Sequence, residues 1–267
     1  MTASCISPSL MAPFSRTPDE SRPSKLLMAL ETRAALEWAS IPWTLPLLLG
    51  AVPRGDGHSV LVLPGLLAGD TSTAPLRRFL KLLGYDVHGW SQGRNFGPRA
   101  GVRERLEETL EALHERTGRK VSVVGWSLGG LFAREIARAA PQHVRQVITL
   151  GSPLYGPHEN TNAWEIYRIV SDNDAAEGRG DSAPPVPTTS IYSRGDGVVA
   201  WGCSVERPGP QTDNIEINAA THMGLGANAL VWYAVGDRLA LPEDQWTHFQ
   251  PRGAYRLLYP FKAPHRD

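Results

Sequence analysis

The chain has 267 residues, of which 42% are apolar and 20% charged, a usage typical of globular rather than disordered or fibrous proteins. This length suffices for one α/β domain with a full hydrophobic core and is short for two. Lys and Arg together number 27, as do Asp and Glu. Because nucleic acids and anionic membranes attract a basic excess, neither is expected as a partner.

The longest apolar stretch, residues 41–52, is interrupted by Pro42 and Pro46 and is shorter than the roughly 18 residues that cross a bilayer. The first ten residues hold no basic residue ahead of an apolar run, so no secretory signal is predicted, although a chain already stripped of its signal would look the same. Cys5 and Cys203 do not form a disulfide framework. We therefore expect no membrane-spanning segment and a cytoplasmic location.

Residues 1–24 are rich in Pro, Ser and Thr, which predicts a disordered N-terminal arm. The apolar positions of residues 25–39 have helical spacing, so residues 25–57 are expected to form a helix at the domain edge followed by a linker. Residues 242–267 form a C-terminal tail whose pattern predicts no element.

Between residues 58 and 241, buried strands alternate with helices, which predicts a mostly parallel sheet covered on both faces. The expected strands are 59–63, 85–90, 120–124, 146–150, 188–192 and 214–217, and the expected helices are 73–83, 102–116, 127–139 and 224–239. Residues 152–187, with one helical stretch at 163–171, break this alternation and predict a lid-like insertion. Catalytic groups are expected in the loops that leave the strands.

A serine stands between two glycines in the segment Gly125-Trp126-Ser127-Leu128-Gly129, which matches the G-x-S-x-G pattern of a nucleophile elbow. In isolation such a string would arise by chance in roughly one chain in ten of this length. Here a buried strand comes directly before it and a helix directly after it. Ser127 is therefore the candidate nucleophile, and the alternative is a glycine-rich turn that happens to contain a serine.

The string from Val123 to Leu131 resembles the lipase box of α/β-hydrolases, and its Gly125–Gly130 part is similar to the form found in bacterial esterases and lipases. The resemblance extends over residues 58–239. It implies the α/β-hydrolase fold and a serine hydrolase activity. It says little about the substrate.

A serine hydrolase needs two donors aimed at the oxygen that becomes negative in the tetrahedral intermediate. The peptide N–H of Leu128, which follows the nucleophile, is one candidate. Bacterial lipases carry a His-Gly pair and an apolar residue after the first strand of this pattern, and here the string is Pro64-Gly65-Leu66. By position, Leu66 N–H is the second donor. The alternative is an ordinary Pro-Gly turn.

In α/β-hydrolases the acid and then the base follow the nucleophile in the chain. Asp196 directly follows the expected strand 188–192, in a loop that resembles the acid loop of bacterial lipases, although an Asp-Gly turn is the plainer interpretation. His222 lies between the last expected strand and the last helix, where the base belongs; a structural histidine is the alternative. Four further histidines follow the nucleophile at positions that do not suit the base: His143, His158, His248 and His265.

Five apolar residues near these positions are candidates for lining a substrate pocket: Trp126, Leu67, Leu154, Trp164 and Val199. For each tryptophan, core packing is the alternative. The string Gly224–Ala229 matches a dinucleotide-binding pattern, but it begins too near the domain end for a βαβ unit to follow. No metal-ligand spacing is present. We expect neither cofactor nor metal.

These residues together predict an esterase or lipase that cleaves a small-molecule or lipid ester through an acyl-enzyme. An acyltransferase or amidase would use the same triad. A binding protein that kept the fold without catalysis is a further alternative.

Overall fold

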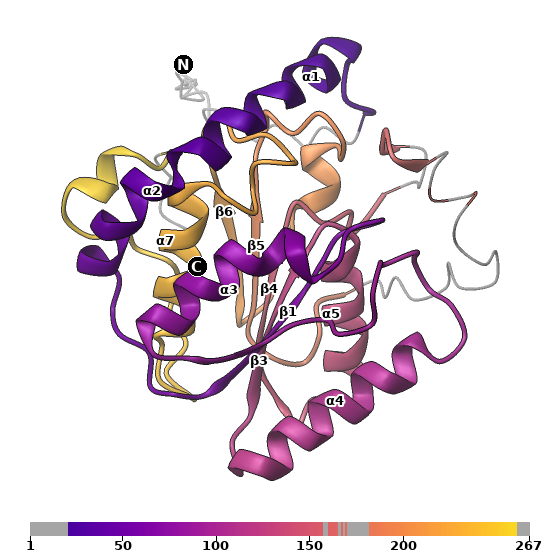
Figure 1. Ribbon diagram of the computed structural model, residues 1–267, viewed down its shortest axis with the longest axis vertical. Helices are drawn as coiled ribbons and strands as arrows, with labels where there is room; N and C mark the ends of the chain where they lie inside the picture. The colour runs from indigo at the N-terminus through magenta and orange to yellow at the C-terminus, as the bar shows by residue number, and fades with distance from the viewer. Residues whose placement is uncertain (1–20, 157–159, 165–166, 168, 170–181, 261–267) are drawn as a thin grey trace, which may run out of the picture.

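A six-stranded sheet forms the centre of the structure, a computed structural model that describes residues 21–156, 160–164, 167, 169 and 182–260 (Figure 1). The strand order is β2-β1-β3-β4-β5-β6, and every neighbouring pair is parallel. The strands are β1 (Ser59–Leu63), β2 (Asp86–His88), β3 (Val121–Trp126), β4 (Val144–Leu150), β5 (Thr188–Tyr192) and β6 (Thr212–Glu216). The predicted parallel α/β architecture is confirmed.

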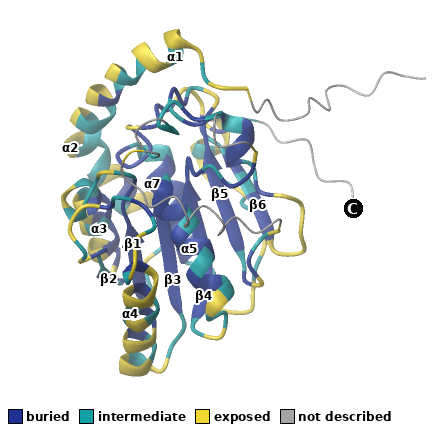
Figure 2. Ribbon diagram, turned by 90° about the vertical axis from the view of Figure 1, so that its right-hand side faces the viewer, coloured by how far each residue is buried: buried dark blue, intermediate teal, exposed yellow. Residues whose placement is uncertain are grey.

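Helices cover both faces of this sheet. α3 (Asp70–Leu83) and α7 (Ala229–Leu239) lie on one face, and α4 (Val102–Thr117) and α5 (Leu128–Ala139) on the other. In β1, Val60 and Val62 pack with the first pair, whereas Leu61 and Leu63 pack with the second. Every residue of β1 is buried, and Figure 2 shows the central strands of the sheet in the colour of buried residues. Burial on both faces explains the unbroken apolar run in the sequence.

The N-terminal helix is longer than predicted. α1 (Lys25–Leu30), the 3-10 turn η1 (Glu31–Arg33) and α2 (Ala34–Ala51) follow one another directly, so the helix continues past residue 39 and through Pro42 and Pro46. Each proline removes a backbone hydrogen bond, which alone would favour an end to the helix. Packing outweighs this loss, because the inner side of α2 lies against α3 and α7, with Leu48 fully buried.

The outer side of the same helices carries large apolar side chains that are exposed: Leu26, Met28, Leu36, Trp43 and Leu47. α1 and α2 run along one side of the molecule in Figures 1 and 2. Within the described ranges, no helix combines the length and the hydropathy needed to cross a bilayer.

The last helix begins later than predicted. Residues 222–227 form turns rather than helix, and α7 starts at Ala229. Asn228 explains the start, because its side chain accepts hydrogen bonds from Leu230 N at 2.9 Å and Val231 N at 3.4 Å, the contacts of a helix cap. The loop that carries His222 is therefore longer than expected.

Parts of three predicted segments lie outside the described residues: most of the arm 1–24, most of the helical stretch 163–171 and the end of the tail. The described part of the tail contains the 3-10 turn η5 (Gly253–Leu257) and packs on α7, where Tyr255 stacks on Tyr233 at 3.9 Å. A further short 3-10 turn, η4 (Trp201–Ser204), follows the loop after β5. The sequence pattern predicted neither turn.

A buried hydrogen-bond chain links Asp56, His58 and Ser122 near the amino ends of β1 and β3. His58 Nδ1 lies 2.5 Å from Asp56 Oδ1, and His58 Nε2 lies 2.8 Å from Ser122 Oγ. Both His58 and Ser122 are 0% exposed. Arg119 and Arg145 bind the other oxygen of Asp56 at 2.5 and 3.0 Å. These hydrogen bonds thus tie the beginnings of two central strands to one buried arginine, Arg145, and one partly exposed arginine, Arg119.

Candidate active site

Ser127 occupies the turn between β3 and α5 with φ 52°, a conformation that is strained for a residue with a side chain. Its two flanking glycines make the turn possible. A Cβ at Gly125 would overlap the backbone of Gly129, and a Cβ at Gly129 would lie 2.5 Å from the Leu63 carbonyl oxygen. Ser127 N also donates to Leu150 O at 2.8 Å, which anchors the turn to β4. The sequence pattern of an elbow therefore corresponds to an elbow in space.

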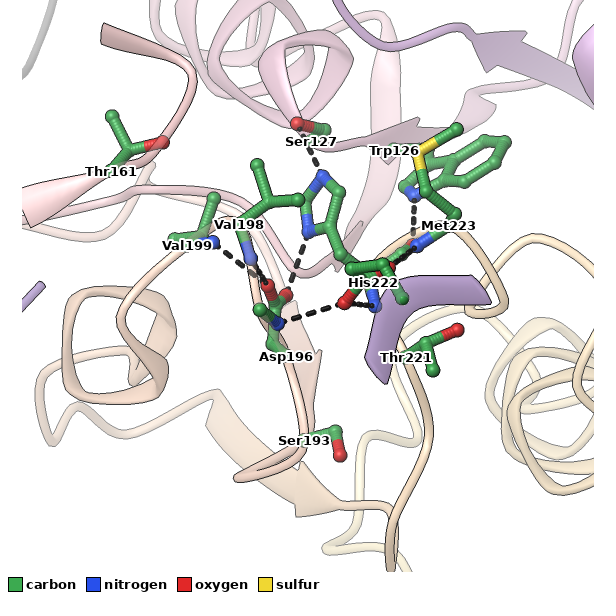
Figure 3. Close-up of polar contacts among 12 residues, drawn as sticks. Trp126, Ser127, Thr161, Ser193, Asp196, Val198, Val199, Thr221, His222 and Met223 are labelled. Carbon is green, nitrogen blue, oxygen red and sulfur yellow. Dashed lines mark hydrogen bonds and ion pairs between the residues drawn. The ribbon is translucent and has the colours of Figure 1, made fainter. Parts of the chain in front are cut away.

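The structure brings the three predicted triad residues together from the loops after β3, β5 and β6 (Figure 3). Ser127 Oγ lies 3.0 Å from His222 Nε2, and His222 Nδ1 lies 2.7 Å from Asp196 Oδ2. The second oxygen of Asp196 accepts hydrogen bonds from Val198 N at 2.8 Å and Val199 N at 2.7 Å. The carboxylate is therefore held on both sides, with one oxygen left to orient the imidazole.

The pKa of His222 is raised above its ordinary value of 6.5. Burial acts against this, because the ring is almost inaccessible to water and the charged form loses hydration. The charge of Asp196 and its hydrogen bond outweigh burial, and the charge of Glu31 adds to them. The site thus stabilises an imidazolium, the form that the base takes after it has removed a proton from serine.

The two predicted oxyanion donors both border the pocket beside Ser127, since Leu66 and Leu128 line it. The loop that carries Leu66 approaches the elbow closely: a Cβ at Gly65 would stand 3.2 Å from Ser127 Cβ. A glycine at this position lets the Leu66 peptide come near the nucleophile. The Pro64 that replaces the usual histidine does not prevent this approach.

Asn95, which sequence reasoning missed, holds the Leu66 loop in place. It is 0% exposed, and its Nδ2 donates to Pro64 O at 2.8 Å, while its Oδ1 accepts from Gly97 N at 3.0 Å. Its backbone pairs with the loop as well, donating to Ala68 O at 2.8 Å and accepting from Leu67 N at 2.6 Å. No motif surrounds Asn95 in the sequence, so only the fold reveals this contact.

A small pocket of about 40 Å³ opens at Ser127. Of the five candidate lining residues, Trp164 and Val199 border it. The other three do not line it. Trp126 is in the core, and its indole N–H donates to His222 O at 3.2 Å. Leu154 is buried, and Leu67 is 37% exposed on the loop that carries Leu66. The remaining lining side chains are mostly apolar: Leu131, Pro153, Thr161, Ala163 and Tyr167.

Other polar clusters do not compete with this site. His143 stacks on His114 at 4.5 Å, and His248 lies 3.8 Å from Asp213, whereas His158 and His265 fall outside the described residues. Among the described side chains, no group of three or more His, Cys, Asp and Glu is placed to hold a metal ion.

Parts of the chain are similar to known hydrolases. A family model described as palmitoyl protein thioesterase matches residues 81–190, less than half of the chain. The serine hydrolase BPHL of Mus musculus is 29% identical over 128 residues, 44% of either chain. A pimeloyl-[acyl-carrier protein] methyl ester esterase of Yersinia enterocolitica is 32% identical over 75 residues, which cover 28% of this chain and 27% of the relative. The chain thus matches less than half the length of these curated relatives.

Two solved lipases share the fold. Lipase B of Aspergillus fumigatus superposes with a TM-score of 0.55 at 20% identity, covering 74% of this chain and 58% of that one. Lipase BlEst2 of Bacillus licheniformis superposes with a TM-score of 0.52 at 18% identity, covering 70% of this chain and 94% of that one. The parallel sheet and these superpositions show that the chain has the α/β-hydrolase fold, and the partial sequence matches make it similar to serine hydrolases of the esterase and lipase type.

Proposed function

We propose that this chain is a serine hydrolase that cleaves carboxylic esters through an acyl-enzyme. One observation carries the proposal: hydrogen bonds run from Asp196 through the His222 ring to Ser127 Oγ, and the Ser127 end lies at a mostly apolar pocket. Such a chain serves to remove the serine proton as the hydroxyl attacks a carbonyl. The similarity to serine hydrolases, an ester esterase and two lipases supports the same reaction class.

The proposed reaction has two halves. In the first, neutral His222 takes the proton of Ser127 as its oxygen attacks the ester carbonyl, and the Leu66 and Leu128 peptide N–H groups bind the oxyanion. The imidazolium then protonates the leaving alcohol, and an acyl group remains on Ser127. In the second half, His222 removes a proton from water as the water oxygen attacks the acyl-enzyme. The imidazolium then returns this proton to Ser127 Oγ as the acyl–oxygen bond breaks and the acid leaves. Asp196 stays ionised throughout and keeps the ring in the required tautomer.

Thioesters are a second substrate class, favoured by the match to the palmitoyl protein thioesterase model. A thioester presents the same carbonyl to Ser127 and differs in its thiol leaving group, so the same residues serve both. Acyl transfer to an alcohol and amide cleavage require only another acceptor or leaving group. Product analysis with competing alcohols distinguishes transfer from hydrolysis, and parallel assays with matched oxygen ester, thioester and amide distinguish the leaving groups.

Replacement of Ser127 by Ala tests the proposal. The variant should lose turnover of p-nitrophenyl acetate and butyrate and labelling by a fluorophosphonate probe. Its far-UV circular dichroism and unfolding midpoint should match those of the wild type. Ser122→Ala is the matched control, because Ser122 also hydrogen-bonds a histidine but is fully buried, and it should keep the label. Labelling that survives in Ser127→Ala would refute the assignment of the nucleophile.

A further inference from the structure

The loop that presents His222 is held by carboxylates from the N-terminal helix. Three successive peptide N–H groups of this loop donate to these carboxylates. Thr221 N donates to Glu37 Oε1 at 3.0 Å, His222 N to Glu31 Oε1 at 2.9 Å and Met223 N to Glu31 Oε2 at 2.9 Å. Trp38 of the same helix donates its indole N–H to Met223 O at 3.0 Å. The position of the base therefore depends on a segment about 190 residues earlier in the chain.

Glu31 also reaches the loop of the acid. Gly197 N, which directly follows Asp196, donates to Glu31 Oε1 at 2.8 Å. One carboxylate thus accepts hydrogen bonds from both the Asp196 loop and the His222 loop, and both are charge-assisted bonds, stronger than those between neutral groups. Glu37 differs in this respect, because its contacts are confined to Thr221 and Asn228 on the His222 side.

A glycine in each of the two loops lets the N-terminal helix pack closely against them. A Cβ at Gly197 would overlap the Leu27 carbonyl of α1, and a Cβ at Gly224 would overlap the Glu37 carboxylate. Both glycines lie within two residues of Asp196 or His222. A side chain at either position would push the N-terminal helix away from the triad, so the packing of this helix is built into the active-site loops themselves.

The charges around His222 can be enumerated by element. Asp196 faces the ring from the loop after β5, and Glu31 faces its backbone from η1. Glu37 of α2 binds Thr221 and Asn228 and has no hydrogen bond to His222 among the described residues. The nearest basic group in the acid loop, Arg194, is instead bound to Glu216 at 2.8 Å. Glu31 is thus the second anion that an imidazolium at position 222 experiences.

We propose that Glu31 is a positioning residue of the active site, which locks the acid and base loops to one another and favours the protonated state of His222 during catalysis. The inference rests on the proposed hydrolase function. It makes the N-terminal helix a part of the catalytic unit rather than an appendage at its edge. The pKa of His222 is raised although burial acts to lower it, and the charge of Glu31 contributes to this rise, which agrees with the proposed role.

The direct test follows the imidazole of His222 by NMR in full-length Ser127→Ala protein, with the signal assigned by its loss in His222→Asn. Glu31→Gln keeps one acceptor oxygen and removes the charge. We expect it to lower the pKa of His222 by on the order of half a unit or more. Glu37→Gln removes a second charge that lies near the same loop, and it should shift the pKa of His222 less. Glu104→Gln removes an exposed charge on α4 and should leave the pKa of His222 unchanged.

The kinetic test uses the same substitutions on the active enzyme. Glu31→Gln should lower kcat for p-nitrophenyl butyrate roughly 10-fold with KM within about two-fold, because misplaced catalytic groups slow chemistry more than binding. Its pH profile of kcat/KM should move to lower pH, and Glu31→Asp should restore part of the rate. A purely structural role would lower the unfolding midpoint without moving the profile.

The two hypotheses fail separately. An unchanged His222 titration in Glu31→Gln, or equal shifts in Glu31→Gln and Glu37→Gln, would overturn the role of Glu31 even if Ser127 is the nucleophile. A wild type that no fluorophosphonate labels would overturn the hydrolase proposal, and the NMR titration would still decide whether Glu31 acts on His222, because it requires no turnover.

Discussion

The Leu67 peptide N–H donates to the Asn95 carbonyl oxygen at 2.6 Å, and Leu67 itself has φ 59°. A branched side chain rarely adopts this left-handed conformation, so the contact with a fully buried asparagine holds a strained loop in place. The strain lies directly beside Leu66, the proposed oxyanion donor. The shape of the proposed oxyanion hole therefore depends on a residue almost 30 positions further along the chain.

Asn95→Ala should therefore damage catalysis through the loop. The change leaves Pro64 O and Gly97 N without the side-chain partners they now have, at a cost of about 1 to 3 kcal/mol for each group left unsatisfied. We expect kcat to fall by about 10-fold or more with a smaller change in KM. Steady-state kinetics on p-nitrophenyl butyrate and thermal unfolding measure both effects. Asn95→Asp keeps the acceptor for Gly97 but turns a carboxylate oxygen toward Pro64 O in a fully buried site, so it should be at least as damaging. Wild-type kcat in Asn95→Ala would contradict this account.

The acid limb of the pH profile should report His222. The ring must be neutral to accept the serine proton, and its pKa is raised above 6.5, so kcat/KM should fall as the pH decreases through a midpoint above 6.5. The effect on stability has the opposite sign: the folded state binds this proton more tightly, which adds stability below pH 6.5 that is lost as the pH rises through the folded pKa. A midpoint at or below 6.0 for the free enzyme would contradict the prediction.

The pocket at Ser127 should determine the preferred acyl length. Trp164, which stacks on Tyr167 with the ring centroids 5.7 Å apart, forms part of the pocket wall and limits the room for a long acyl chain. Trp164→Ala should raise kcat/KM for p-nitrophenyl octanoate relative to the acetate, whereas Ala163→Phe should lower it. Each methylene group that gains or loses burial contributes about 0.8 kcal/mol, roughly a four-fold change in rate. Acyl preference that is unaltered in both variants would place the acyl group elsewhere.

The nucleophile helix depends on a buried ion pair. Arg134 of α5 is 2% exposed and pairs with Glu206, which is 1% exposed and also accepts a hydrogen bond from Tyr155 OH. Glu206→Ala would leave a buried guanidinium without its anion and should lower the free energy of unfolding by about 3 to 5 kcal/mol. Urea unfolding measures this loss. The double variant Arg134→Met with Glu206→Leu should recover a large part of it, and a double variant as unstable as the single one would contradict the explanation.

Some of this site follows from local sequence and some does not. Gly125, Ser127 and Gly129 could be placed in advance because an elbow requires adjacent residues with defined backbone freedom. Asp196 and His222 could be placed because parallel strands bring their carboxyl ends to one edge of the sheet. In each case the prediction came from a short sequence motif, from the end of a strand, or from the order of the triad residues in the chain.

The N-terminal helix marks the limit of that reasoning. Residues 40–51, with Pro42 and Pro46, were expected to lie in a linker, but burial of the inner face of α2 against the core keeps them helical. Glu31 and Glu37 look like ordinary surface charges in the sequence, because their partners are peptide N–H groups more than 160 residues away. The start of α7 was also missed, since a glycine-containing string suggested helix where Asn228 caps one.

The chain holds two arrays in which a carboxylate, an imidazole and a serine hydroxyl follow one another at hydrogen-bond spacing. The hydrogen-bond distances alone do not distinguish the Asp56-His58-Ser122 array from the Asp196-His222-Ser127 array. The difference is that Ser127 lines a pocket, whereas Ser122 is fully buried. A carbonyl compound has no route to Ser122, whose side chain is sealed between strands and helices. Intact-mass spectrometry after exhaustive fluorophosphonate treatment should therefore detect a single adduct per molecule, because reactivity here is decided by access.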